Sequence, residues 1–227
     1  MVGNIRRRRI LIAALAGAVL AALGFTVASS HATLNDVREL SKSTPANTAF
    51  ASLAAGTTYR ASLVSPTPTV TPPIRGWLGA QFVTHQRSKV RYETAVLLWQ
   101  DYAGREVDIL SGPAMTLSPS ATLGRPRSRI PHWNFSPYQQ PGPVKRWTVA
   151  GRQALYFDAT APPPGEWTLV GSNPPELLID HDHSFRMAAL TVHGKTVVIV
   201  VQAPEPSFAE FLPVAERLLA ALRFPSS

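Results

Sequence analysis

Proline is the residue that most restricts how this chain can fold. All 21 prolines of the 227-residue sequence follow residue 44, so more than one residue in nine of the remaining chain is proline. Proline has no backbone N–H to donate, and it is costly inside a helix or a central strand. Long helices and long strands are therefore disfavoured here, and the segments between prolines are expected to be short.

Those segments are rich in β-branched and aromatic residues, the composition typical of strands. Ten of them are predicted as strands: 58–64, 77–83, 90–99, 105–110, 145–149, 153–158, 167–170, 176–179, 185–192 and 195–202. The clearest hairpin joins the last two through His193-Gly194, because glycine accepts the positive φ of a two-residue turn. Strand 195–202 is apolar on both faces, which predicts a central place in the sheet.

The chain ends in a predicted amphipathic helix. Apolar residues recur at i, i+3, i+4 and i+7 from Phe208 to Leu222, which forms one apolar stripe. Ser207 and Glu210 have the spacing of a capping box, and the helix either kinks at Pro213 or restarts with Pro213 in its first turn. Since the stripe must be buried, the sequence predicts an α+β fold with an antiparallel sheet packed against this C-terminal helix.

The N-terminus has the layout of an export signal or a membrane anchor. Arg6–Arg9 precede Ile10–Ala28, a run of 19 uncharged residues, and no acidic residue occurs before Asp36. A helix of roughly 20 apolar residues crosses a membrane, and the basic flank stays in the cytoplasm. A cleaved signal peptide and an uncleaved anchor are both open. The cytoplasmic membrane is thus the expected partner of residues 10–28, and the C-terminal domain is expected outside it, on a single-pass anchor or secreted.

Charge and cysteine content exclude several classes of function. Four of the 22 basic residues lie in the leader, which leaves 18 against 14 acidic residues, a net charge of only +4 for the rest. This mild excess and the expected export exclude nucleic-acid binding. The absence of cysteine excludes disulfides, thiol chemistry and cysteine metal sites.

The sequence divides into three parts. Residues 1–32 are predicted as a basic stub plus a signal peptide or membrane-anchor helix. Residues 33–56 are small and polar, and are predicted as a flexible stalk. Residues 57–227 are predicted as the exported α+β domain, with a long proline-rich loop at 111–143.

Two segments carry candidate site residues. In the proline-rich loop, Arg125, Arg127, Arg129 and Trp133 could bind a sugar, an anionic head group or a phosphate through bidentate hydrogen bonds and stacking. The alternative is a flap whose aromatic rings cover the sheet while its arginines face water.

The second segment is Asp180-His181-Asp182-His183. On an extended strand His181 and His183 would lie on one face, a spacing seen in zinc sites, but no third ligand is fixed by the sequence. The alternative is a solvated turn between two strands. The carboxylates Glu93, Asp101, Glu106 and Asp108 also lie near one another in the sequence, but this closeness does not establish an acid–base pair.

Several of these features together resemble a group of exported actinobacterial proteins of unknown function with the Mog1/PsbP-like fold. They are Gly76-Trp77-Leu78-Gly79, Gly194–Ile199, Ala203-Pro204 and the closing Phe208–Phe224 helix. The resemblance implies a curved antiparallel sheet flanked by helices and a role in binding or as an accessory protein. It supplies no catalytic residues.

The sequence contains no G-x-S-x-G, H-E-x-x-H, phosphate-loop or dinucleotide motif. The leading hypothesis is therefore a membrane-anchored or secreted cell-envelope protein that binds a ligand or partner without catalysis, and no catalytic residue or cofactor is expected. The alternative is a metal-dependent hydrolase or metal sensor centred on His181 and His183.

Overall fold

The computed structural model describes residues 37–44, 49–85, 91–100, 104–111, 143–160, 167–170, 177–179 and 182–226. Residues 35–227 form one compact unit. The predicted stub and membrane-entering segment, residues 1–32, lie outside the described part. Within the described part, no helix is both long enough and apolar enough to span a membrane.

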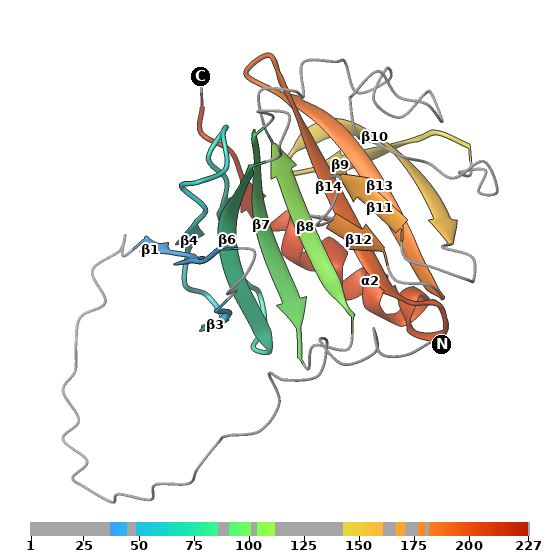
Figure 1. Cartoon of the computed structure of the whole chain (residues 1–227), viewed down its shortest axis with the longest axis horizontal. Helices are drawn as coiled ribbons and strands as arrows, with labels where there is room; N and C mark the ends of the chain where they lie inside the picture. Colours follow the sequence, from blue (N-terminus) through green and yellow to red (C-terminus); the bar gives the residue numbers. More distant parts are fainter. Residues whose placement is uncertain are drawn as a thin grey trace, which may run out of the picture. The chain divides into compact units, whose positions relative to one another are not determined.

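A large, mainly antiparallel sheet forms the body of the domain (Figure 1). Its strand order is β2 (Ser41–Lys42), β6 (Trp77–His85), β7 (Arg91–Trp99), β8 (Glu106–Ser111), β14 (Lys195–Pro204), β13 (His183–Val192), β10 (Arg152–Thr160) and β9 (Lys145–Val149), and β3 (Ala51–Leu53) also pairs with β6. Only the β2–β6 pair within this sheet is parallel.

Two smaller sheets complete the strand pattern. The first has the order β1 (Arg38–Glu39), β4 (Tyr59–Arg60), β5 (Thr69–Val70) and β15 (Leu222–Arg223), and the second pairs β11 (Trp167–Val170) with β12 (Leu177–Ile179). The helix α2 (Glu205–Ala220) follows β14. In Figure 1 the helix lies behind the large sheet, and the β11–β12 hairpin is drawn in front of it.

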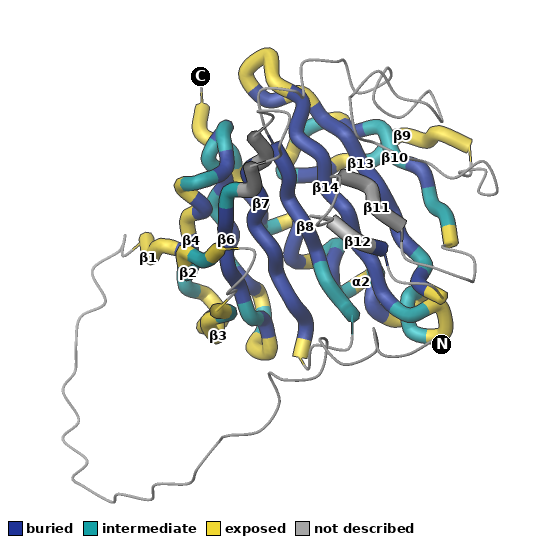
Figure 2. Tube along the Cα trace, in the orientation of Figure 1, coloured by how far each residue is buried: buried dark blue, intermediate teal, exposed yellow. Residues whose placement is uncertain are grey.

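The C-terminal hairpin has the two strands and the two-residue turn that the sequence predicts. His193 and Gly194 both have positive φ, 49° and 75°, as a tight turn between β13 and β14 requires. Strand β14 lies between β8 and β13, and it is buried along most of its length (Figure 2). The predicted antiparallel α+β class is likewise borne out for the part of the chain that the structure describes.

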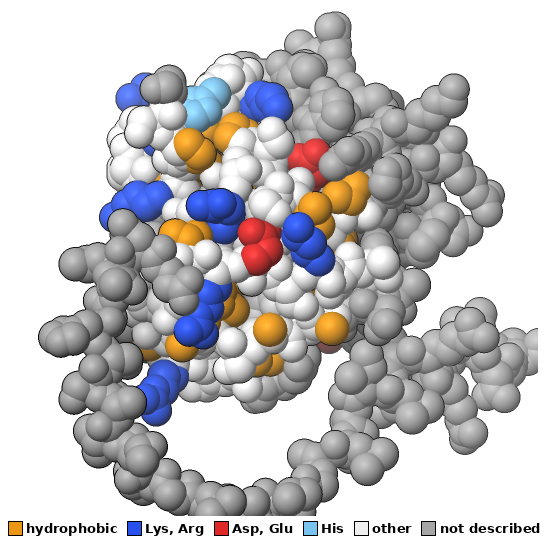
Figure 3. Space-filling model, turned by 90° about the vertical axis from the view of Figure 1, so that its left-hand side faces the viewer, with side chains coloured by type: hydrophobic (Ala, Val, Ile, Leu, Met, Phe, Trp, Pro, Cys, Tyr) orange, Lys and Arg blue, Asp and Glu red, His pale blue; other side chains and the backbone are white. Residues whose placement is uncertain are grey.

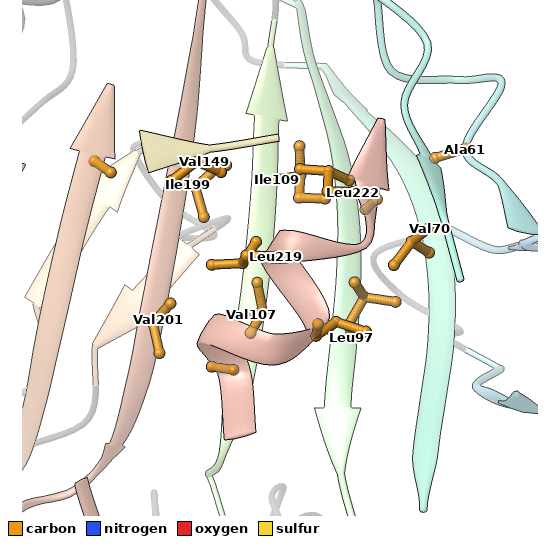
Figure 4. Close-up of a cluster of buried hydrophobic side chains, with 14 of the residues drawn as sticks. Ala61, Val70, Leu97, Val107, Ile109, Val149, Ile199, Val201, Leu219 and Leu222 are labelled. Atoms are coloured by element: carbon orange, nitrogen blue, oxygen red, sulfur yellow. The ribbon is translucent and has the colours of Figure 1, made fainter. Parts of the chain in front are cut away.

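The core lies between the large sheet and α2. The helix buries Phe211, Ala215, Leu218 and Leu219, and Figure 4 shows Leu219 among side chains of β8 and β14. Burying a large apolar side chain stabilises the fold by about 1.5–3 kcal/mol. Packing of this stripe therefore holds the helix against the sheet.

A charged cluster adds to this packing at one end of the interface. Arg186 of β13 donates from Nε and Nη2 to the two oxygens of Asp158, at 2.7 and 3.1 Å, and from Nη1 to Glu216 of α2, at 2.9 Å. Its guanidinium carbon lies 4.2 Å from the centroid of Tyr156 and 5.2 Å from that of Trp147. One cation therefore links β13, β10 and β9 to the helix.

The described residues of the segment predicted as a flexible stalk, 37–44 and 49–56, include three short strands of the domain. Leu40 and Leu53 are only 1% and 2% exposed, and strands from this segment pair with β4 and β6. A Cβ at Gly79 would lie 2.9 Å from Leu40 Cδ2 and 3.0 Å from Leu53 Cδ1. The absence of a side chain at Gly79 thus makes room for Leu40 and Leu53. The low apolar content of residues 33–56 did not predict this packing.

The predicted capping box is also wrong. The helix begins at Glu205, its N-cap is Pro204, and no side chain caps it. Ser207 Oγ instead donates to the Pro204 carbonyl at 3.1 Å. Because Pro206 lies in the first turn, its fixed φ and missing N–H suit this start. Pro213 lies inside the continuous helix.

Candidate functional site

A row of polar side chains crosses the small sheet. The backbone register places Glu39 beside Arg60, Arg60 beside Thr69, and Thr69 beside Arg223, on four neighbouring strands. In the row next to it, Tyr59, Val70 and Leu222 are buried. Because side chains alternate between the faces of a strand, Arg60, Thr69 and Arg223 share the outer face.

An open groove lies over this row. It has a volume of about 470 Å³ and is lined by Arg60, Ser62, Thr67, Thr69, Arg223, Phe224 and Pro225. This size is within the range of about 300–1,000 Å³ that is usual for small-molecule sites. The lining combines two guanidinium groups, three hydroxyl groups and an apolar wall formed by Phe224 and Pro225.

The loop that carries part of the groove is held by buried polar side chains of the large sheet. The Leu63 amide donates to Gln81 Oε1, and the Ser65 amide donates to Glu93 Oε2, both at 2.8 Å. Gln81 is fully buried and Glu93 is 8% exposed. These bonds fix the path of the chain between β4 and β5, and so position the hydroxyl groups of the groove.

Glu39, the acidic residue of the row, binds the loop and the large sheet and forms no ion pair with the groove arginines. Its Oε1 accepts hydrogen bonds from the Ser62 amide at 3.0 Å and from Gln81 Nε2 at 2.6 Å. Partial burial raises the pKa of Glu39, but hydrogen bonds from Ser62 and Gln81 and the charge of Lys42 outweigh it, so the pKa lies below its usual value. The Glu39 carboxylate therefore holds the loop between β4 and β5 through its hydrogen bond with the Ser62 amide.

Both groove arginines keep their positive charge uncompensated. Arg223 donates from Nη1 to the carbonyls of Ala220 and Leu222, at 2.6 and 2.7 Å, and these acceptors are neutral. No ion pair joins either arginine to another residue of the described part. Figure 3, which views the edge of the domain that carries the small sheet, shows Lys and Arg side chains with few acidic ones between them.

A second polar group is buried on the opposite face of the large sheet from α2. Asp108 lies between Val96 and Val200 on the neighbouring strands and is 1% exposed. Complete burial raises the pKa of Asp108 to about 7, although hydrogen bonds with Gln202 and Glu106 act in the opposite direction. Gln202 also donates to Glu106. A carboxyl group with such a pKa can be protonated or ionised near neutral pH.

Most of the residues nominated from the sequence lie outside the part of the chain that the structure describes. Arg125, Arg127, Arg129 and Trp133 lie outside the described residues, so their predicted role stays a prediction. His181 is also outside them.

The structure describes only the second half of the Asp180–His183 segment. Asp182 is exposed in a turn with φ of 61°, and its carbonyl accepts a hydrogen bond from the Glu205 amide at 2.7 Å. His183 is buried at the start of β13, where a Cβ at Gly104 would overlap its ring. In the part of the chain that is described, no three His, Asp or Glu side chains form a group suited to a metal ion. The metal hypothesis remains a prediction that involves undescribed residues.

Sequence reasoning missed the basic groove. Arg60 lies within the predicted strand 58–64, and Arg223 lies within the predicted closing helix 208–224. No local pattern marks either as a binding residue, because they are brought together by a two-residue strand, β15, that pairs with β5. The closeness of Glu106 and Asp108 in the sequence did not predict this buried group, because Gln202, which lies beside them, comes from a distant strand.

No family model matches the chain, and no curated protein matches it. The chain is similar to the crystal structure of LpqN, a protein involved in cell envelope biogenesis of Mycobacterium tuberculosis. The TM-score is 0.30 and the identity 11%, over 78% of this chain and 79% of LpqN. A similarity this low supports no inference about function, and the resemblance to the Mog1/PsbP-like fold stays a prediction.

Proposed function

We propose that this protein is a cell-envelope binding domain that recognises an anionic group of its ligand in the groove over the small sheet. The proposal rests on one observation: Arg60 and Arg223 flank Thr69 in one row, and neither arginine is neutralised by a carboxylate of the described part. Two uncompensated guanidinium groups at an open groove favour a negatively charged ligand.

The spacing of the row suits a single phosphate or carboxylate group. Adjacent strands lie about 4.8 Å apart, so the backbones of Arg60 and Arg223 are about 10 Å apart with Thr69 between them. Both side chains are long enough to reach a group centred over Thr69, whose hydroxyl can donate a third hydrogen bond. The carbon part of the ligand would then lie against Phe224 and Pro225.

The cellular location in this proposal comes from the sequence. The basic block Arg6–Arg9 followed by the uncharged run Ile10–Ala28 is the pattern of a chain exported across the cytoplasmic membrane. An anionic ligand in that compartment would be a phosphate or carboxylate carried by a lipid, a polymer or a free small molecule.

The test is calorimetric titration of the full chain in non-ionic detergent with inorganic phosphate and with glycerol phosphate. Because a hydrogen bond to a charged group contributes about 1.5–3 kcal/mol, Arg60→Gln and Arg223→Gln should each weaken binding roughly 10- to 100-fold. Arg146→Gln is the matched control, since it removes an exposed arginine from β9, at the other edge of the large sheet.

Equal affinity of the wild type and the two groove variants would refute the proposal, as would absence of saturable binding by both anions. Glycerol phosphate binding that is much tighter than phosphate binding would identify an organic phosphate as the ligand class, because only the former can contact the apolar wall.

A further inference from the structure

A separate, smaller pocket lies between the helix and the end of strands β7 and β8. Its volume is about 170 Å³, and it is lined by Trp99, Arg105, Glu210, Phe211 and Val214. Trp99 ends β7, Arg105 immediately precedes β8, and the other three come from one side of α2. The Trp99 amide donates to the Arg105 carbonyl at 2.9 Å, which holds these two walls together.

The inner wall of the pocket is aromatic. Trp77 packs behind it, with its ring centroid 5.0 Å from that of Trp99 and 6.2 Å from that of Phe211. Trp99 and Phe211 are 8% and 2% exposed. A ligand in this pocket would therefore place an apolar group against rigid rings.

Arg105 is the unusual residue of the pocket. Its Nε is buried and has no hydrogen-bond partner among the residues that the structure describes, and no ion pair there involves its guanidinium. A buried N–H that lacks a partner costs free energy comparable with a lost hydrogen bond. The planar guanidinium fork is suited to a carboxylate, which would supply the missing acceptor.

Glu210 gives the pocket an opposite charge. This exposed carboxylate lines the same pocket as Arg105, yet the two do not form an ion pair. A cation and an anion that line one small pocket without forming an ion pair match a molecule that itself carries a carboxylate and an ammonium group. The remaining lining, Trp99, Phe211 and Val214, is apolar.

We infer that this pocket binds a free α-amino acid with an apolar side chain. Arg105 takes the α-carboxylate, Glu210 takes the α-ammonium, and the side chain lies against Trp99 and Phe211. The small volume limits the ligand to a single residue the size of valine or leucine. This site is independent of the groove that contains Arg60 and Arg223.

The experiment is calorimetric titration of the full chain in non-ionic detergent with three ligands that differ by one charge. L-Leucine carries both charges, leucinamide lacks the carboxylate, and 4-methylpentanoate lacks the ammonium group without adding bulk. Leucine should bind saturably, and each of the other two should bind at least tenfold more weakly. Leucinamide or 4-methylpentanoate binding as tightly as leucine would overturn the inference, and so would the absence of saturable leucine binding.

Variants of Arg105 and Glu210 test which of the two residues binds the carboxylate of leucine and which binds its ammonium group. Arg105→Gln should weaken leucine binding at least tenfold, and Arg105→Lys, which keeps the charge but loses the planar fork, should weaken it less. In Glu210→Gln, leucine and 4-methylpentanoate should bind equally, because the variant no longer distinguishes the ammonium group. Arg217→Gln, on the exposed part of the same helix, is the control and should bind leucine as the wild type does.

Circular dichroism shows whether each variant is folded, and Arg105→Lys provides the test if Arg105→Gln is not. Unchanged leucine affinity in Arg105→Lys and Arg105→Gln, or a persistent preference of Glu210→Gln for leucine, would contradict the assignment. Loss of phosphate binding at the groove has no bearing on these outcomes.

Discussion

Ionisation of Asp108 should make the stability of the domain depend on pH. The carboxyl group is 1% exposed between two valines, and its Oδ2 has no hydrogen-bond partner in the described part of the chain. Burial raises its pKa to about 7, whereas an unfolded aspartate has a pKa of about 3.9. The folded protein therefore holds a proton that the unfolded chain releases.

The sign and size of the effect follow from linkage. Because the folded pKa is the higher one, the stabilising contribution is fully present below pH 4 and is lost as the pH rises towards 7. Each unit of pKa difference corresponds to about 1.4 kcal/mol, so the loss is at most about 4 kcal/mol. Asp108→Asn cannot ionise, and it keeps a polar group of the same shape beside Gln202 and Glu106.

The assay is urea unfolding of the full chain in non-ionic detergent at pH values from 4 to 8, followed by tryptophan fluorescence. The difference between the free energies of unfolding of Asp108→Asn and the wild type removes the contributions of titrating groups that do not contact Asp108. The variant should be close to the wild type at pH 4 and more stable by up to about 4 kcal/mol at pH 8.

Glu205→Gln serves as the control, because it neutralises an exposed carboxylate in the first turn of α2. It should change the free energy of unfolding by less than about 1 kcal/mol across the range. A pH-independent difference between Asp108→Asn and the wild type, or a variant that is less stable at pH 8, would show that Asp108 is not held protonated in the folded protein.

Two further predictions concern the packing of the fold. Arg186→Met should lower the free energy of unfolding by about 2–4 kcal/mol in urea, because it leaves two partly buried carboxylates without their cation, whereas Arg152→Met should change it little. The side chain introduced by Gly79→Val would overlap Leu40 and Leu53, so the change should lower the free energy of unfolding by about 1–3 kcal/mol. It should also make residues 37–44 cleavable by protease while the rest of the protein stays folded. Unchanged urea midpoints for Arg186→Met, or proteolytic protection of residues 37–44 in Gly79→Val, would contradict these explanations.

Much of the sheet could be predicted from the sequence because its signals are local. The turn at His193-Gly194 needs only two residues with positive φ, and the buried strand β14 is visible as an unbroken apolar run. The apolar stripe of α2 is also local, since side chains three and four residues apart lie on one face. The start of that helix was less well predicted, because Pro206 in its first turn replaced the capping side chain that the spacing suggested.

The edge of the fold and the candidate sites depended on tertiary structure. Leu40 and Leu53 belong to the core only because Gly79, on another strand, leaves space for them. Arg60 and Arg223 become neighbours of Thr69 only when chain segments from opposite ends of the domain pair with β5. The sequence by itself determined where strands, a turn and a helix form, since those depend on residues a few positions apart. Burial of the whole core decided which strands pair, and strand pairing decided which charged side chains become neighbours. These contacts join segments that are far apart in the sequence, so they form only in the tertiary structure.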